Sequence, residues 1–172
     1  MTKTPDIESA AIRKANVLSV GPTDPNDDCL ERIFHASDWS AYTNSEWTLI
    51  TTATFASAFS VLGIVSIPIV LCDCELKPGT WQEMLDYLSL LPDPPRLILS
   101  SRLPDERIWS EALNLGAYDI LAKPYDPAEV IRIVSLAWQH WLDRHDIHND
   151  LTDRNRVVQT HRRASIFTRE QE

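Results

Sequence analysis

Short apolar segments alternate with helical patterns along most of this chain, and this alternation restricts its fold more than any other feature. The clearest segment is 67–72 (IPIVLC), whose nearly unbroken apolar run predicts a strand buried on both faces. Further strands are expected at 15–20, 47–53, 96–99 and 118–122, and helices at 29–34, 55–62, 81–91, 104–115 and 126–142. Strands that alternate with helices in this way predict an α/β fold, a parallel sheet with helices on both faces.

Polar side chains follow three of the predicted strands. Asp73 comes directly after the strand at 67–72, Ser100 directly follows the segment at 96–99, and Lys123 follows the last strand. The carboxyl ends of parallel strands meet at one edge of a sheet, which is where such folds carry their sites. A lone Asp–Lys pair would be explained by a salt bridge and a lone serine by a helix cap. A carboxylate, a hydroxyl and an ammonium group together suit the handling of a phosphoryl group.

The sequence also disfavours several functional classes. It has no glycine-rich phosphate loop after any strand, which disfavours a nucleotide-dependent enzyme. It also has no histidine near a strand end, so an α/β enzyme that uses Asp73 as a base is the weakest alternative, and we expect no enzymatic activity. The net charge of −9 is carried by residues 1–142, which argues against nucleic-acid binding. Serines, Gly63 and Pro68 interrupt the most apolar stretch, and no signal peptide is recognisable, so we expect a cytoplasmic protein without membrane contact.

Two segments resemble the receiver domain of bacterial two-component response regulators. One is Ser100–Tyr125 (SSRLPDERIWSEALNLGAYDILAKPY), with its Gly-Ala and Lys-Pro-aromatic pairs, and the other is the stretch IVLCDCELKPG around Asp73. The resemblance covers residues 15–142. It implies a flavodoxin-like, three-layer fold with a five-stranded parallel sheet in the order 2-1-3-4-5.

The resemblance also implies roles for the residues at the strand ends. Asp73 matches the phospho-acceptor, Ser100 and Lys123 match the residues that contact the phosphoryl group, and Pro124 matches the proline after the lysine. The implied partners are a histidine kinase or a phosphotransfer protein. The implied function is phosphorelay signal transduction through protein–protein interaction.

The metal site departs from the family pattern. Receiver domains end their first strand in two acidic residues that hold Mg²⁺ together with the acceptor aspartate, but this chain has Gly21 and Pro22 there. Asp24 would join Asp73 as a metal ligand only if its loop bends back. In addition, Ile120 replaces the aromatic residue that usually reports the switch. We therefore expect weak Mg²⁺ affinity and impaired Mg²⁺-dependent phosphorylation. The alternative is a pseudo-receiver, a phosphorylation-independent dimerisation or interaction module.

The ends of the chain complete the expected organisation. Residues 1–14 are expected to be a flexible segment, 15–142 the receiver-like domain and 143–172 a polar tail. The last helix has a second apolar stripe beside the one that faces the sheet. That stripe and a residue of the preceding helix predict a homodimer with Trp138 near the centre of an interface that includes Ile131, Leu142 and Trp109. The alternative is a wide buried face or a cap over this stripe by the N-terminal segment.

The chain has three cysteines: Cys29, Cys72 and Cys74. Cys72 and Cys74 flank Asp73, and no second cluster of cysteine or histidine residues accompanies them, so the spacing is a poor zinc motif. We expect buried, reduced thiols.

Overall fold

The computed structural model describes residues 12–22, 28–36, 39, 42–103 and 105–167, and it gives the backbone alone for 28, 36 and 148–167. The chain divides into two compact units, residues 1–138 and 139–172. Within the described ranges, no helix is long and apolar enough to span a bilayer. Of the sequence predictions, Asp24 and residues 1–11 of the N-terminal segment lie outside the described residues.

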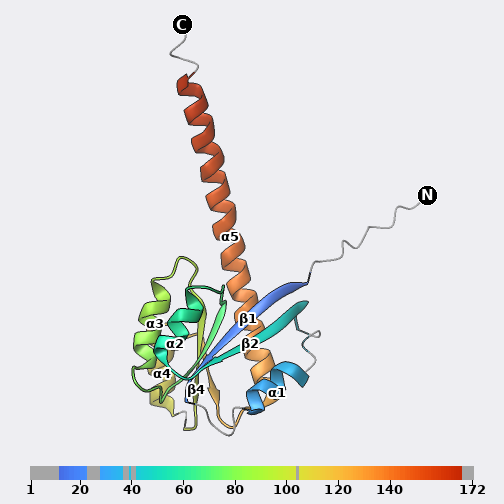
Figure 1. The fold of residues 1–172 in the computed structure, drawn as a ribbon, viewed down its shortest axis with the longest axis vertical. Coiled ribbons are helices and arrows are strands. Elements are labelled where there is room, and N and C mark those ends of the chain that lie inside the picture. Colours follow the sequence, from blue (N-terminus) through green and yellow to red (C-terminus); the bar gives the residue numbers. More distant parts are fainter. Residues whose placement is uncertain (1–11, 23–27, 37–38, 40–41, 104, 168–172) are drawn as a thin grey trace, which may run out of the picture. The chain divides into compact units, whose positions relative to one another are not determined.

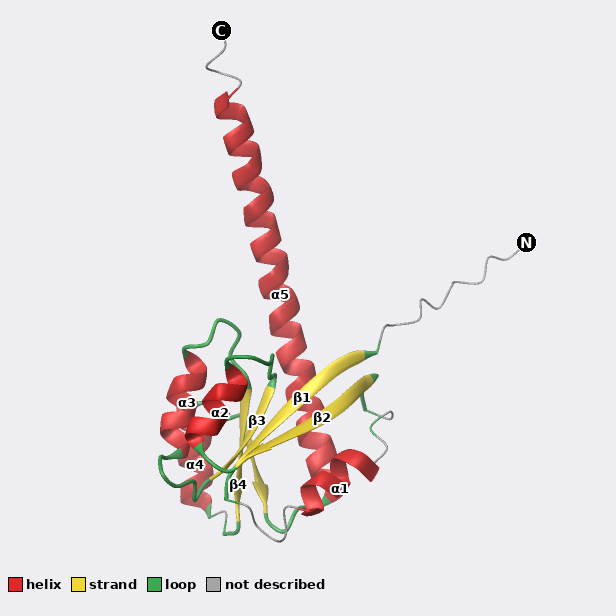
Figure 2. Cartoon of the chain, viewed as in Figure 1, coloured by secondary structure: helices red, strands yellow, loops and turns green. Residues whose placement is uncertain are grey.

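Five strands and five helices alternate along the chain (Figures 1 and 2). The strands are β1 (Arg13–Val20), β2 (Ser45–Thr52), β3 (Ile69–Asp73), β4 (Arg96–Ser101) and β5 (Asp119–Ala122). The helices are α1 (Asp28–Ala36), α2 (Phe55–Leu62), α3 (Trp81–Ser89), α4 (Glu106–Leu115) and α5 (Pro127–Phe167). All strand pairs are parallel and the order is β2-β1-β3-β4-β5. The predicted flavodoxin-like sheet is confirmed.

Local sequence signals fix where the helices near the sheet's carboxyl edge begin and end. Thr80 and Glu83 form a capping box at the start of α3, in which the Thr80 hydroxyl accepts the Glu83 amide and Glu83 binds the Thr80 amide in return. The carboxylate of Asp105 caps α4 through the amide of Ile108, at 2.8 Å. Helix α4 ends at Gly116, whose φ of 112° is a left-handed conformation that favours glycine.

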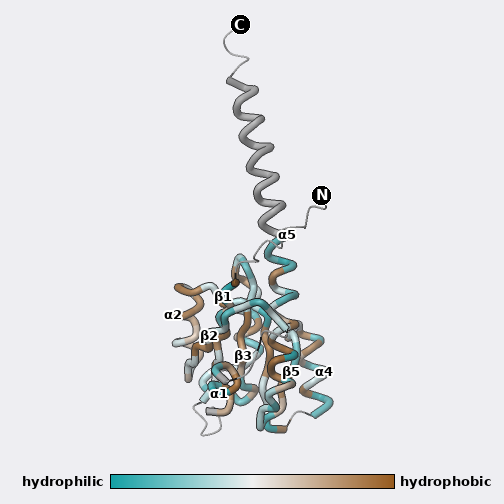
Figure 3. The backbone as a smooth tube through the Cα atoms, turned by 90° about the vertical axis from the view of Figure 1, so that its right-hand side faces the viewer, coloured by the Kyte–Doolittle hydropathy of each residue, from teal (hydrophilic) through white to brown (hydrophobic). Residues whose placement is uncertain are grey.

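Apolar residues of both sheet faces are covered by helices. On one face, buried residues of α2, α3 and α4 pack with alternate strand residues, and the cluster includes Leu18, Val70, Met84, Leu99 and Ala112. The strands β3 and β4 are buried along nearly their whole length, and the hydrophobic colour marks much of the sheet and of α2 in Figure 3. Helix α1 and the first turns of α5 cover the other face, as Figure 1 shows.

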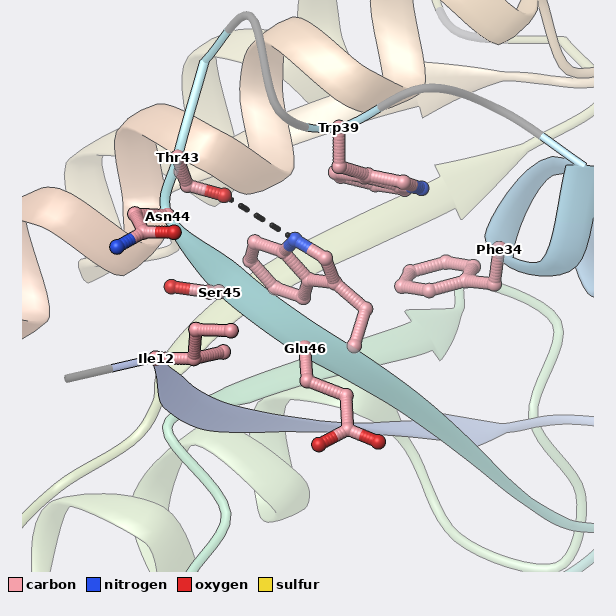
Figure 4. Close-up of a pocket in the computed structure, with 8 residues that line it drawn as sticks. Ile12, Phe34, Trp39, Thr43, Asn44, Ser45 and Glu46 are labelled. Carbon is pink, nitrogen blue, oxygen red and sulfur yellow. Dashed lines mark hydrogen bonds between the residues drawn. The ribbon is translucent and has the colours of Figure 1, made fainter.

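An aromatic cluster joins α1, β2 and α5 on that second face. The rings of Phe34 and Trp39 lie 4.9 Å apart, those of Trp39 and Trp47 4.7 Å, and those of Trp47 and Trp138 6.1 Å, between centroids. Trp47 Nε1 donates to Thr43 Oγ1 at 3.2 Å (Figure 4). Trp138 Nε1 donates to Ser45 Oγ at 2.9 Å. Trp138 is therefore part of the folded core.

The burial of Trp138 corrects the predicted interface. Trp138 is 4% exposed and Ile131 9%, so the prediction that they form an exposed stripe is wrong, and the alternative of a wide buried face is correct for these two residues. The cause is the segment before and within β2, whose residues Trp39 and Trp47 extend the core outward to Trp138. Trp109 of α4 remains partly exposed, at 37%. Leu142 belongs to the second unit.

Two predicted boundaries also change. Helix α5 continues to Phe167, so the prediction that it ends at Leu142 is wrong. Residues 143–167 contain neither proline nor glycine, so nothing in the sequence stops the helix once it has started. Strand β1 begins at Arg13, so the last two residues of the predicted N-terminal segment belong to the sheet.

Candidate functional site

The register of the sheet brings the predicted residues to one edge. Asp73 is the Cα partner of Ser100, and Val20 is the partner of Cys72, so Gly21 follows β1 beside Asp73. Leu121 pairs with Ser100, and Lys123 lies two residues beyond Leu121. Because side chains alternate along a strand, Gly21, Asp73, Ser100 and Lys123 belong to the same side of the sheet.

An ion pair forms the centre of this edge. Lys123 Nζ lies 2.6 Å from Asp73 Oδ2, and only about a tenth of each side chain is exposed. The Lys123 amide donates to the carbonyl of Ser101 at 2.8 Å, and the Lys123–Pro124 peptide bond is cis. Lys123 Nζ also lies 5.7 Å from the centre of the Tyr125 ring, within the range of a cation–π contact. Backbone and side-chain contacts together therefore hold the ammonium group at the carboxylate.

The second oxygen of Asp73 is bound as well. The amide of Glu75 donates to Asp73 Oδ1 at 2.7 Å, which closes a tight turn directly after β3. The carbonyl of Asp73 accepts the amide of Leu76 at 3.2 Å in the same turn. The carboxylate thus has one donor on each oxygen. Charged acceptors form the stronger class of hydrogen bonds, so these two donors hold the carboxylate firmly in its orientation.

Two adjacent serines end β4, and the sheet register separates them. Ser100 is 3% exposed and shares its side of the sheet with Asp73. Ser101 is 6% exposed and, as the next residue, points to the other side, where its Oγ accepts the amide of Leu103 at 3.2 Å. Sequence reasoning selected Ser100 and passed over Ser101. The sequence feature that points to Ser101 is the Ser-Arg-Leu turn after the strand, in which a serine commonly accepts a backbone amide.

The residues described at this edge do not fit a divalent metal. Mg²⁺ prefers several oxygen ligands in octahedral geometry. Among the described residues, Asp73 is the one carboxylate at the centre of the edge, and both its oxygens already accept hydrogen bonds. Gly21 and Pro22 offer no side-chain oxygen at the end of β1, and Glu75 is exposed. Within the described residues, no group of three or more His, Cys, Asp or Glu side chains is placed to hold a metal ion. Asp24, the other predicted ligand, is outside those residues.

Cysteines flank the acceptor position, and their thiols are held protonated. Burial raises the pKa of Cys72 to about 12, and the neighbouring Cys74 and Asp73 add to this effect. Burial likewise raises the pKa of Cys74 to about 11, with the carboxylates of Asp73 and Glu75 contributing. Both cysteines are free thiols, as is Cys29. Thiols with such raised pKa values are poor nucleophiles and poor metal ligands at neutral pH.

A separate hollow lies at the opposite edge of the sheet. It has a volume of about 380 Å³ and is lined by residues where β1 and β2 begin, among them Ile12, Trp39 and Trp47 (Figure 4). All strands are parallel and Asp73 ends β3, so the hollow and Asp73 are at opposite ends of the strands. The hollow is therefore not part of the candidate site.

Comparison with known proteins supports one fold. No protein-family model matches the sequence, and no curated protein matches it. Among solved structures, the signal receiver domain of an HD domain-containing protein from Pseudomonas fluorescens has a TM-score of 0.68 at 19% identity, over 80% of this chain and 96% of that one.

Two further receiver structures agree. A CheY-like response regulator receiver domain protein from Methanospirillum hungatei has a TM-score of 0.61 at 16% identity, over 76% of this chain and 98% of that one. The receiver domain of a signal transduction histidine kinase from Syntrophus aciditrophicus has a TM-score of 0.59 at 17% identity, over 73% and 91%. In strand order, helix placement and similarity to solved structures, this chain has the receiver-domain fold.

Proposed function

We propose that this protein is a receiver-type signalling module of a phosphorelay, which acts by binding other proteins and accepts a phosphoryl group at Asp73. The observation that carries this proposal is the 2.6 Å contact between Lys123 Nζ and Asp73 Oδ2 at the carboxyl edge of the sheet. A carboxylate nucleophile beside a fixed cation matches the needs of phosphoryl transfer, because the cation can pair with the negatively charged phosphoryl group that arrives at the acceptor.

The proposed reaction uses few groups. One oxygen of Asp73 forms a bond to the phosphorus of a phosphohistidine on a histidine kinase or phosphotransfer protein. The bond from phosphorus to the donor's imidazole nitrogen breaks, and the imidazole leaves with its electron pair and takes a proton from solvent. Lys123 then pairs with a phosphoryl oxygen, and the Ser100 hydroxyl donates to another. The product is an acyl phosphate on Asp73.

We propose further that this transfer is slow and gains little from Mg²⁺. Metal ions normally neutralise charge on the transferring group, and the described residues at this edge supply a single carboxylate that is already paired. Lys123 takes over part of that task with its one positive charge. The phosphorylation-independent module remains the second candidate, because Gly21 and Pro22 replace the ligands that a metal would need.

Intact-mass spectrometry after incubation with a small acyl-phosphate donor tests the proposal. We expect slow addition of one phosphoryl group to the wild type, at a similar rate with and without Mg²⁺. Asp73→Asn should abolish the addition, whereas Asp86→Asn, which changes an exposed carboxylate of α3, should leave it unchanged. No addition to the wild type under any condition would favour the phosphorylation-independent module. Equal addition to Asp73→Asn would place the acceptor elsewhere.

A homodimer is also proposed, but with its interface centred on α4 instead of α5. Trp109 is 37% exposed and Leu113, four residues on and on the same side of the helix, is 45% exposed. Sedimentation velocity at micromolar concentrations should detect a dimer that Trp109→Glu weakens without loss of folding. A monomeric wild type would remove the dimer from the proposal and leave Asp73 chemistry untouched.

A further inference from the structure

We infer that Gly21 is a positioning residue for Asp73: because residue 21 has no side chain, the end of β1 lies directly against the acceptor aspartate. The functional meaning of this inference rests on the proposed role of Asp73. The packing itself is independent of that role and can be tested without any phosphoryl donor.

The contact is unusually close. A Cβ atom added to Gly21 would lie 2.9 Å from Asp73 Cβ, closer than non-bonded carbon atoms pack. It would also lie 3.7 Å from Asp73 Oδ2 and 3.8 Å from Asp73 Cγ. The Cβ of Asp73 cannot rotate away, because it moves only with the backbone of β3. A side chain at residue 21 therefore requires one of the two strands to shift.

Neither strand is free to shift easily. The Gly21 amide donates to the carbonyl of Thr52 at 3.0 Å, which ties the end of β1 to β2. On the other side, the amide of Cys74 donates to the carbonyl of Ser100 at 2.9 Å, which ties the end of β3 to β4. Displacement of either end would break one of these backbone bonds or lengthen the pair between Asp73 and Lys123.

Backbone conformation does not explain the glycine. The glycines with left-handed φ values in the described chain are Gly79 and Gly116, and Gly21 is not among them. An L-amino acid is therefore compatible with the backbone angles at residue 21. What the position requires is the absence of a side chain, and the neighbour that imposes this requirement is Asp73.

The same contact argues against an acidic side chain at residue 21 in this arrangement. An acidic side chain at residue 21 would begin with the Cβ atom that Asp73 excludes. Gly21 thus closes one side of the carboxylate, while Lys123 and the Glu75 amide hold its two oxygens. Asp73 is left 8% exposed. The position of the acceptor therefore depends on Gly21.

A double-mutant cycle on the full chain tests this coupling. We expect Gly21→Ala to lower the melting temperature by several degrees, about 3–10 °C, as overpacking does in a domain of this size. In the Asp73→Gly background, which lacks the colliding Cβ, the same change should lower it by less than a third as much. Gly63→Ala is the matched control, because its added Cβ meets only ordinary contacts, the nearest at 3.5 Å, and should cause little change.

An amide resonance gives a second readout. The Glu75 amide reports on Asp73 Oδ1, so its ¹H–¹⁵N cross-peak should move in Gly21→Ala and stay in place in Gly63→Ala. The inference is overturned if Gly21→Ala behaves like Gly63→Ala in both measurements. It is also overturned if Gly21→Ala lowers the melting temperature as much in the Asp73→Gly background as in the wild type. If Gly21→Ala does not fold alone, recovery of folding in the double variant supports the inference, and its failure to recover overturns it. If the double-mutant cycle gives the expected result but the protein never takes up a phosphoryl group, only the proposed function is refuted.

Discussion

Lys123 Nζ and Asp73 Oδ2 lie 2.6 Å apart although fifty residues separate them in the chain. The pair links the ends of β3 and β5, which are not neighbours in the sheet because β4 lies between them. Both side chains are largely buried, so removal of either one leaves a buried charge without its ion-pair partner. We therefore expect the pair to matter for stability as well as for the proposed chemistry.

We expect Lys123→Met to destabilise the fold by about 2–3 kcal/mol, the lower part of the range for an uncompensated buried charge, because a little solvent reaches the pair. The double variant Lys123→Met with Asp73→Asn should recover part of this loss, since the unpaired charge is then gone. Urea denaturation gives both values. Lys77→Met, at an exposed position, is the control. A Lys123→Met loss no larger than that of Lys77→Met would show that the pair contributes nothing to stability.

The two serines of β4 should differ when each is changed to alanine. Ser100→Ala removes the hydroxyl beside Asp73, and we expect slower phosphoryl uptake with nearly unchanged stability. Ser101→Ala removes the acceptor of the Leu103 amide and should cost about 1 kcal/mol of unfolding free energy, with a smaller effect on uptake. Intact-mass kinetics and urea denaturation on both variants separate the two roles. The reverse pattern would transfer the phosphoryl contact to Ser101.

Alkaline pH should destabilise the protein through its cysteines. In the folded state the pKa of Cys72 is about 12 and that of Cys74 about 11, against about 9 when unfolded. Between these values the folded state binds more protons than the unfolded state. The contribution of the two thiols to the free energy of unfolding therefore has its full value below pH 9 and declines as pH rises toward 12. Burial raises the pKa of Tyr118 as well, which adds to the decline.

Urea denaturation across pH 8–11 measures this effect. The variant Cys72→Ala with Cys74→Ala is the comparison, because it keeps every other alkaline titration. Its stability should fall less steeply with pH than that of the wild type. If the stability of the two proteins falls equally with pH, neither thiol has the raised pKa that its burial implies.

Much of the fold was predictable because its signals are local. The run IPIVLC needs two buried faces, Gly116 ends α4 in a left-handed conformation, and Asp105 caps the same helix. The site was predictable for a related reason, since Asp73 and Lys123 end apolar strands and the sheet edge gathers strand ends. The close approach of Gly21 to Asp73 was not predictable, because it depends on the separation of two strands in space.

The errors arose where distant segments meet. The sequence places Trp138 on a second apolar stripe of the last helix, which predicts exposure, but the ring of Trp47, itself packed against Trp39, lies against it. Helical periodicity places a side chain on a face but does not say what packs against that face. The end of α5 was misplaced because apolar periodicity stops at Leu142, whereas a polar helix can continue without a breaker.

The hydrogen bond from Trp138 Nε1 to Ser45 Oγ leads to the last prediction. Trp138→Glu should destabilise the domain by about 3–5 kcal/mol or more, because it removes a buried indole and introduces a charge among aromatic rings. Ser45→Ala should cost about 1–3 kcal/mol because the indole N–H loses its acceptor, and Trp138→Phe with Ser45→Ala should cost less than the sum of the single changes. Leu136→Glu, on the exposed side of the same helix, is the control. Urea denaturation and sedimentation on all variants decide whether Trp138 lies in the core or at an interface. A stable, monomeric Trp138→Glu variant would indicate that Trp138 forms a dimer contact. An unfolded variant would confirm that Trp138 belongs to the core.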